Sequence, residues 1–195
     1  MRLWLARHAA PLVVPGLCYG ASDVAADPAL TCVAAERLAA ALPQHVIVQC
    51  SPLQRCHALA AALHDLRPDL LVQTNPLLAE MDFGDWEGQL WTAIGKSALA
   101  AWTDDFAQHQ PGGGESVMAF MQRVATAWSA ASAAAAPDSL WITHAGVIKA
   151  ARLLAKGHRE IERADQWPTE IVAFGEWTTL PLPIAGLPLR HQLNS

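Results

Sequence analysis

The chain has few charged residues and no excess of positive charge. Asp, Glu, Lys and Arg make up only 16% of its 195 residues, and the formal net charge is -5. This balance argues against broad electrostatic attraction to nucleic acid, so an anionic ligand would need a local cluster of cations. No apolar run approaches the ~20 residues of a membrane span, and the apolar stretch at residues 2–6 is too short for a signal peptide. We therefore expect neither a nucleic-acid nor a membrane partner.

Cysteine is also sparse and shows no metal-binding or redox spacing. The four cysteines contain no Cys-x-x-Cys pair; they are Cys18, Cys32, Cys50 and Cys56. Free thiols without such a framework are typical of a reducing compartment. We therefore expect reduced cysteines and a cytoplasmic location.

What the chain does contain is an alternation of strand-like and helix-like segments. Strands are predicted at 2–7, 46–50, 70–72, 139–143 and 171–177. Helices are predicted at 32–42, 52–66, 117–131 and 147–156, with Ser51 capping the second and Gly157 ending the last. Such alternation favours a largely parallel sheet covered on both faces. Its length fits a single domain over residues 1–195.

Two stretches do not follow this alternation. Residues 74–116 form a long segment rich in glycine and carboxylates, which predicts a lid-like insertion that shapes or covers an active site. The proline-rich end, with Pro181, Pro183 and Pro188, is expected to wrap the surface or add an edge strand.

Two histidines follow strand-like runs. His8 comes directly after residues 2–7, and His144 directly after 139–143. Residues at the carboxyl ends of strands in an open α/β sheet collect in the crevice where ligands bind. A neutral His8 imidazole is a competent nucleophile toward phosphorus, and the adjacent Arg7 can clamp phosphoryl oxygens. His144 can donate a hydrogen bond to a transferring phosphoryl group. The plainer alternatives are an Arg-His pair that caps a strand and a satisfied core histidine.

Two further residues are candidates for chemistry on an anion. Arg55 lies in the first turn of the helix predicted after Ser51, near the positive end of the helix dipole, or else is an ordinary surface arginine. The carboxyl group of Glu80, if it lies close to a phosphate dianion, would have a raised pKa and could act as a general acid. Spacing alone does not separate it from its neighbours, which are Asp82, Asp85 and Glu87.

Five short motifs in fixed order resemble the histidine phosphatase superfamily, the phosphoglycerate mutase-like proteins, over residues 2–156. They are Arg-His at 7–8, Ser-Pro-Leu-Gln-Arg at 51–55, Leu-Ala-Glu-Met-Asp-Phe-Gly-Asp-Trp-Glu-Gly at 78–88, Pro-Gly-Gly-Gly-Glu-Ser at 111–116 and Thr-His-Ala-Gly-Val at 143–147. The resemblance implies an α/β fold, a three-layer α/β/α sandwich with a mostly parallel central sheet. It also implies a metal-independent mechanism without a cofactor. By it, His8 becomes phosphorylated, Arg7, Arg55 and His144 hold the phosphoryl oxygens, and Glu80 is the proton donor.

The sequence departs from the family pattern after His8. Ala9, Ala10-Pro11 and Val14 stand where many members have Gly, Glu-Thr and Asn. Because the usual polar groups are missing, we expect Tyr19 and Ser22 to contribute to substrate binding.

Within the superfamily, the short length and residues 81–88 are most similar to α-ribazole phosphatases of the cobalamin pathway. The expected activity is hydrolysis of a small phosphomonoester, either α-ribazole 5′-phosphate or a broader range of metabolites. The alternatives are a mutase that returns the phosphoryl group to its substrate and a non-catalytic module that binds or senses a phosphorylated ligand.

Overall fold

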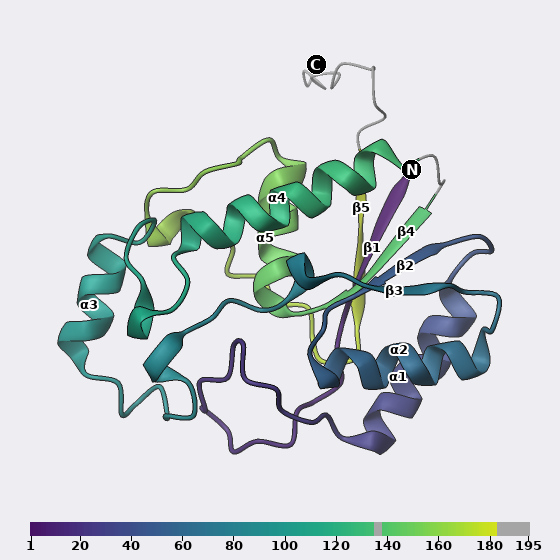
Figure 1. Ribbon diagram of the computed structural model, residues 1–195, viewed down its shortest axis with the longest axis horizontal. Coiled ribbons are helices and arrows are strands. Elements are labelled where there is room, and N and C mark those ends of the chain that lie inside the picture. The colour runs from purple at the N-terminus through teal and green to yellow at the C-terminus, as the bar shows by residue number, and fades with distance from the viewer. Residues whose placement is uncertain (135–137, 183–195) are drawn as a thin grey trace.

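The computed structural model describes residues 1–134 and 138–182, and its centre is a mostly parallel sheet (Figure 1). The strands are β1 (Arg2–Arg7), β2 (Ile47–Cys50), β3 (Val72–Thr74), β4 (Asp138–Thr143) and β5 (Trp177–Pro181). They lie in the order β3-β2-β4-β1-β5, and only β5 runs antiparallel to its neighbour. The predicted mostly parallel sheet is confirmed.

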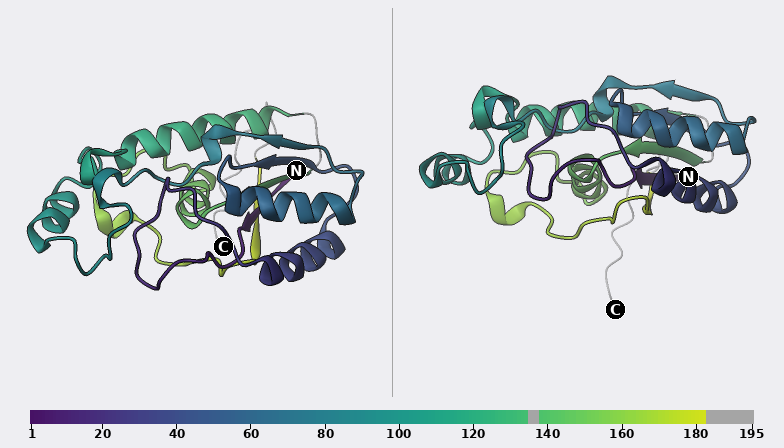
Figure 2. Two further views of the ribbon diagram at one scale, coloured as in Figure 1. Left: turned by 60° about the horizontal axis from the view of Figure 1, so that its bottom comes forward. Right: turned by 90° about the horizontal axis from the view of Figure 1, so that it is seen from below.

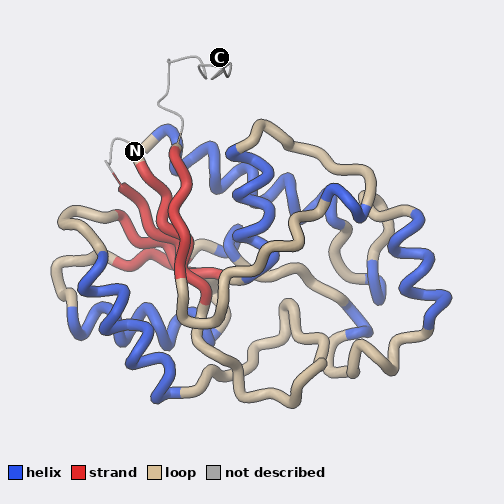
Figure 3. The backbone as a smooth tube through the Cα atoms, turned by 180° about the vertical axis from the view of Figure 1, so that it is seen from behind, coloured by secondary structure: helices blue, strands red, loops and turns tan. Residues whose placement is uncertain are grey.

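Helices cover both faces of this sheet, as Figures 2 and 3 show. Helices α1 (Pro28–Ala41) and α2 (Gln54–Leu66) pack on one face, and α4 (Val117–Ala133) and α5 (Ala145–Ala155) on the other. Side chains alternate along each strand, so Leu3 and Leu5 of β1 join the core under α4 and α5. Trp4 and Ala6 join the core under α1 and α2. The predicted three-layer α/β/α fold is confirmed.

Side chains cap the first turns of α1 and α4, but not that of α2, where a cap was predicted. Helix α1 begins at Pro28 because the Asp27 side chain accepts a hydrogen bond from the Leu30 amide at 3.0 Å. Ser116 caps α4 through the amide of Ala119. The predicted cap at Ser51 is wrong, because α2 begins only at Gln54 and the Ser51 hydroxyl is used elsewhere.

The last predicted strand is also wrong. Residues 171–176 are not a strand; the chain turns at Gly175, which has a φ of +71°, and β5 starts at Trp177. The edge strand β5 ends at Pro181, the first of the three prolines for which an edge strand or a surface segment was expected. Pro183 and Pro188 lie outside the described residues. Residues 171–176 instead run past the ends of β1 and β4, where the candidate site lies.

Residues 74–116 contain little regular structure apart from helix α3 (Lys96–Asp104), which the sequence pattern did not predict. The segment also contains three short 3-10 turns, which are η1 (Pro76–Leu78), η2 (Gly84–Trp86) and η3 (Pro111–Gly113). Turns η2 and η3 touch so closely that a side-chain carbon at Gly112 would lie 2.3 Å from the Phe83 carbonyl. No helix in the described part of the chain is long and apolar enough to cross a membrane.

Candidate active site

The predicted residues converge at the carboxyl ends of β1 and β4. These strands pair in register up to Arg7 and Thr143, so His8 and His144 leave the sheet side by side, with ring centroids 5.2 Å apart. A cavity of about 110 Å³ opens there, and its lining comprises Arg7, His8, Leu17, Tyr19, Gly20, Arg55, Glu80, Phe83, Trp91 and Ala145. Four of the five predicted catalytic residues therefore share one cavity.

His8 is held in one tautomer. Its Nδ1 lies 2.7 Å from the Ala9 carbonyl oxygen, and a carbonyl can only accept, so Nδ1 carries the proton and Nε2 keeps its lone pair. Burial lowers the pKa of His8 to about 3, and the nearby guanidinium groups of Arg55 and Arg7 also lower it. The ring is therefore neutral near pH 7, with a nitrogen free to act as a nucleophile.

Two arginines bring positive charge to the cavity without a carboxylate partner. The Arg7 Nη1 donates to the Val172 carbonyl at 2.9 Å, and its guanidinium lies 3.7 Å from the ring centroid of Phe174. Arg55 is completely buried and donates to the carbonyls of Ser22 and Gly20, at 2.7 Å each.

Neither arginine forms an ion pair among the described residues. Burial lowers the pKa of both guanidinium groups, but from a starting value so high that both stay charged. Buried charge without a counter-ion is costly, so this arrangement favours binding of an anion.

Glu80 faces the same cavity and approaches the start of α5. Its Oε2 accepts a hydrogen bond from the Gly146 amide at 2.9 Å, and its Oε1 one from the Met81 amide at 3.2 Å. Burial raises the pKa of this carboxyl group, which favours the protonated form that a general acid needs. A side-chain carbon at Gly146 would lie 2.3 Å from Oε1, so only glycine leaves room for the carboxylate there.

Arg123 of α4 fixes the backbone that carries Glu80. Its guanidinium donates to the carbonyls of Leu77, Ala79 and Glu80 and pairs with Glu115 at 2.7 Å. Sequence reasoning missed this residue because one arginine at an unremarkable helix position gives no signal. Gly146 was part of a recognised motif, but nothing in the sequence showed what it touches.

His144 lies behind the cavity rather than on its wall. It sits at the N-cap of α5 and is 1% exposed, with its Nε2 2.7 Å from the Ser51 hydroxyl and 3.5 Å from the Cys56 sulfur. Burial lowers the pKa of His144 well below its usual value, and the charge of Arg55 adds to this effect. Ser51 therefore orients a neutral ring beside His8.

The two residues expected to replace the missing polar groups differ in placement. Tyr19 lines the cavity, with its ring centroid 5.5 Å from the Arg55 guanidinium. Ser22 does not line it, because its hydroxyl bonds to the carboxylate of Glu87. Glu87 also accepts hydrogen bonds from the amides of Ala21 and Phe83, so it joins the loop after His8 to residues 74–116.

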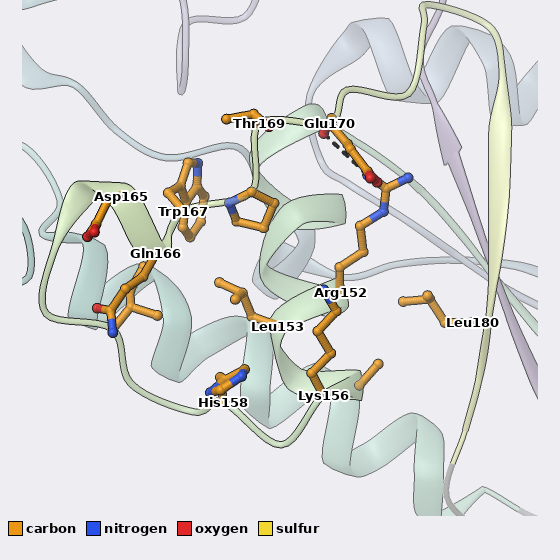
Figure 4. Close-up of a pocket in the computed structure, with 13 residues that line it drawn as sticks. Arg152, Leu153, Lys156, His158, Asp165, Gln166, Trp167, Thr169, Glu170 and Leu180 are labelled. Atoms are coloured by element: carbon orange, nitrogen blue, oxygen red, sulfur yellow. Dashed lines mark hydrogen bonds and ion pairs between the residues drawn. The ribbon is translucent and has the colours of Figure 1, made fainter. Parts of the chain in front are cut away.

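A larger cavity lies elsewhere and holds none of the predicted residues. It measures about 660 Å³, between the second half of α5 and residues 158–170, and Figure 4 shows Arg152, Lys156 and Trp167 around it. The Arg152 guanidinium there pairs with Glu170 at 3.3 Å. Within residues 1–134 and 138–182, no group of three or more His, Cys, Asp or Glu side chains gathers in a way that would hold a metal ion.

Several solved structures share the fold of this chain. A candidate α-ribazole-5′-P phosphatase from Escherichia coli K-12 is 29% identical, with a TM-score of 0.75 over 92% of this chain and 89% of that one. The protein TTHB049 from Thermus thermophilus is 28% identical, with a TM-score of 0.70 over 94% and 95%. A mycobacterial glucosyl-3-phosphoglycerate phosphatase, 24% identical with a TM-score of 0.76 over 92% and 89%, shows the shared fold.

The sequence itself also matches a known family. No curated protein matches it significantly. The profile of the histidine phosphatase superfamily, branch 1, however, matches residues 3–178, which include every motif described above. The chain therefore belongs to branch 1 of the histidine phosphatase superfamily.

Proposed function

We propose that the protein hydrolyses phosphomonoesters through a phosphohistidine at His8. The observation that carries this proposal is the neutral His8 ring, with Nε2 free, in one cavity with two arginines that lack counter-ions. Arg7 and Arg55 bind the phosphoryl oxygens of the substrate. The lone pair of Nε2 attacks phosphorus, the ester P–O bond breaks, and Glu80 gives its proton to the leaving alkoxide.

The second half of the reaction reverses the role of Glu80. Its carboxylate takes a proton from a water molecule, whose oxygen attacks phosphorus and breaks the P–N bond, releasing phosphate and neutral His8. We propose that His144, which lies behind His8, donates a hydrogen bond to the phosphoryl group during transfer. Because the Ser51 hydroxyl pairs with Nε2, this bond comes from Nδ1. We propose that this cycle needs neither metal nor cofactor.

Residues 74–116 are proposed to cover the site. Glu80, Phe83 and Trp91 from this segment line the cavity, and its backbone bonds to the loop after His8. The specific substrate that we propose is α-ribazole 5′-phosphate. The likeness to the Escherichia coli protein supports it, as does the resemblance of residues 81–88.

The test is hydrolysis in the presence of a chelator, with p-nitrophenyl phosphate and a panel that contains α-ribazole 5′-phosphate and 3-phosphoglycerate. We expect phosphate release that His8→Ala abolishes. Glu80→Gln should slow alkyl esters more than p-nitrophenyl phosphate, whose leaving group needs little protonation, and Asp85→Asn serves as the matched carboxylate control.

Four outcomes would contradict the proposal. Activity that persists in His8→Ala would exclude the phosphohistidine. Isomer formation from 3-phosphoglycerate without phosphate release would indicate a mutase. Activity that is lost with the chelator and restored by a divalent metal would overturn metal independence. Silence across the panel in a folded protein would favour a binding module.

A further inference from the structure

The side chains that line the catalytic cavity fall into two chemical groups, a polar one named the charged wall and a largely apolar one named the apolar wall. Arg7, His8, Arg55 and Glu80 form the charged wall. The remaining side chains of any size are Leu17, Tyr19, Phe83 and Trp91. A phosphoryl group bound at the charged wall therefore directs its alcohol toward aromatic and aliphatic surface.

The apolar wall is held in place by aromatic packing. The rings of Phe83 and Trp91 meet edge to face, with centroids 5.3 Å apart and planes at 84°. Trp91 is also nearly parallel to Trp102, at 14° and 6.5 Å between centroids. Such contacts add to the stability of the wall, so Trp91 is presented to the cavity as a supported surface.

Backbone hydrogen bonds connect the segment that carries Trp91 to the loop that follows His8. The Trp91 amide donates to the Gly16 carbonyl at 2.9 Å, and Cys18 exchanges two bonds of 2.8 Å with Gly88 and Gln89. Leu17 and Leu90 form an isolated bridge in the same place. Leu17 and Trp91 thus lie on opposite segments that are tied together at the cavity.

The side chains that line the cavity include no further cation for a second anionic group on the substrate. Its only cationic side chains are Arg7 and Arg55, which the phosphoryl group uses. Lys149 is near enough for its charge to be influenced by Glu80 and Arg7, but it does not line the cavity. A carboxylate placed against Trp91 would lose hydration without gaining a partner, which is unfavourable.

We propose that the Phe83–Trp91 wall selects phosphomonoesters whose alcohol carries a flat apolar ring and disfavours those that carry a carboxylate. This inference rests on the proposed phosphatase function and names the substrate class of that site. The benzimidazole base of α-ribazole belongs to the favoured class, whereas 3-phosphoglycerate belongs to the disfavoured one. Phe83 and Trp91 are then the residues that determine specificity.

The kinetic test compares benzyl phosphate with propyl phosphate, whose leaving alcohols are similarly poor acids, and with 3-phosphoglycerate. For the wild type we expect kcat/KM to be at least about tenfold higher for benzyl than for propyl phosphate, a difference of about 1.4 kcal/mol. Trp91→Leu should bring this ratio close to one. Trp167→Leu is the matched control, because the Trp167 ring packs on Phe106 and Phe120 rather than on Phe83 or Trp91 and does not line the cavity, and it should keep the ratio.

A binding test separates this inference from the phosphatase proposal. Benzylphosphonate and methylphosphonate resist hydrolysis, so calorimetry measures their Kd whether or not the protein turns over any ester. Tighter binding of benzylphosphonate by about tenfold, lost in Trp91→Leu and kept in Trp167→Leu, would support the inference even if no ester were hydrolysed. Equal affinities, an equal loss in both variants, or a kinetic preference for 3-phosphoglycerate would overturn it.

Discussion

Replacing Gly146 with alanine should separate activity from stability. The added carbon would lie 2.3 Å from Glu80 Oε1, so an ordinary van der Waals contact requires the carboxylate to move by roughly 1 Å away from residue 146. A misplacement of that size costs about 100-fold in rate, which is within the usual contribution of a general acid. We therefore expect kcat for an alkyl phosphate to fall about 100-fold, and for p-nitrophenyl phosphate much less.

Stability should change little in the same variant. Gly146 does not have a positive φ and lies in α5, where alanine gains about 0.8–1 kcal/mol over glycine in helix propensity. The displaced Glu80 loses its bond to the Gly146 amide, which costs about 1 kcal/mol for a protonated carboxyl group. Because these terms offset each other, the free energy of unfolding in urea should stay within about 1 kcal/mol of the wild type.

A double-mutant cycle tests whether this effect passes through Glu80. If Gly146→Ala acts only by moving Glu80, it should slow Glu80→Gln far less than it slows the wild type. Full additivity would refute the reasoning. Unchanged kcat in Gly146→Ala, or an equal loss for good and poor leaving groups, would also refute it.

Three further predictions concern the buried charges and their support. Burial lowers the pKa of His8 to about 3 and that of His144 well below its usual value, so below about pH 6.5 the unfolded chain binds more protons than the folded one. The free energy of unfolding should therefore fall as the pH is lowered below about 6.5, by up to about 1.4 kcal/mol per pH unit for each histidine, and for His8 down to about pH 3. Urea unfolding at several pH values checks this, and a flat profile would contradict it. Arg123→Ala should lower the free energy of unfolding by at least about 2 kcal/mol and also reduce kcat, because Arg123 bonds to four groups around the turn that carries Glu80. Glu115→Gln, which removes only the ion pair, is the milder control. A kcat that stays unchanged in Arg123→Ala would show that the turn keeps its position without Arg123. Phe174→Leu should weaken inhibition by inorganic phosphate about two- to fivefold, because it removes the ring under the Arg7 guanidinium; an unchanged inhibition constant would show that the ring does not position Arg7.

Much of the sheet and of the charged wall could be predicted from the sequence. Strand ends in a parallel sheet gather at one edge, so the positions of His8 and His144 follow from the two apolar runs before them. The placement of Arg55 follows in the same way from the strand and helix around it. These predictions depend only on the order of elements along the chain.

The parts that failed depend on contacts between distant segments. Ser51 looked like a helix cap, but its hydroxyl pairs with His144, which is 93 positions away. Ser22 looked available for substrate, but Glu87, 65 positions away, takes its hydroxyl. A short polar side chain can bond locally or to a partner across the fold, and local spacing does not reveal which bond forms.

The apolar wall failed to appear in the sequence for a related reason. Tryptophans in residues 74–116 carry no period of a helix or strand, so nothing distinguishes Trp91, which lines the cavity, from Trp102, which only supports it. The backbone hydrogen bonds between residues 16–18 and 88–91 place the Trp91 ring at the site.

The net charge of -5 is compatible with an anion site because the two relevant charges are local, with Arg55 buried and Arg7 half-buried. Arg7 and Arg55 donate to the carbonyls of Val172, Ser22 and Gly20, and these dipoles orient the guanidinium groups without cancelling their charge. Had carboxylates held them instead, a phosphate dianion would compete with a partner already in place. Solvent and salt screen the interactions of buried charges less than those of surface charges. The attraction of these two arginines for a bound phosphate therefore outweighs the repulsion that the net negative charge of the protein exerts on anions at a distance. Carbonyl support for buried cations thus serves a phosphate site better than ion pairs would.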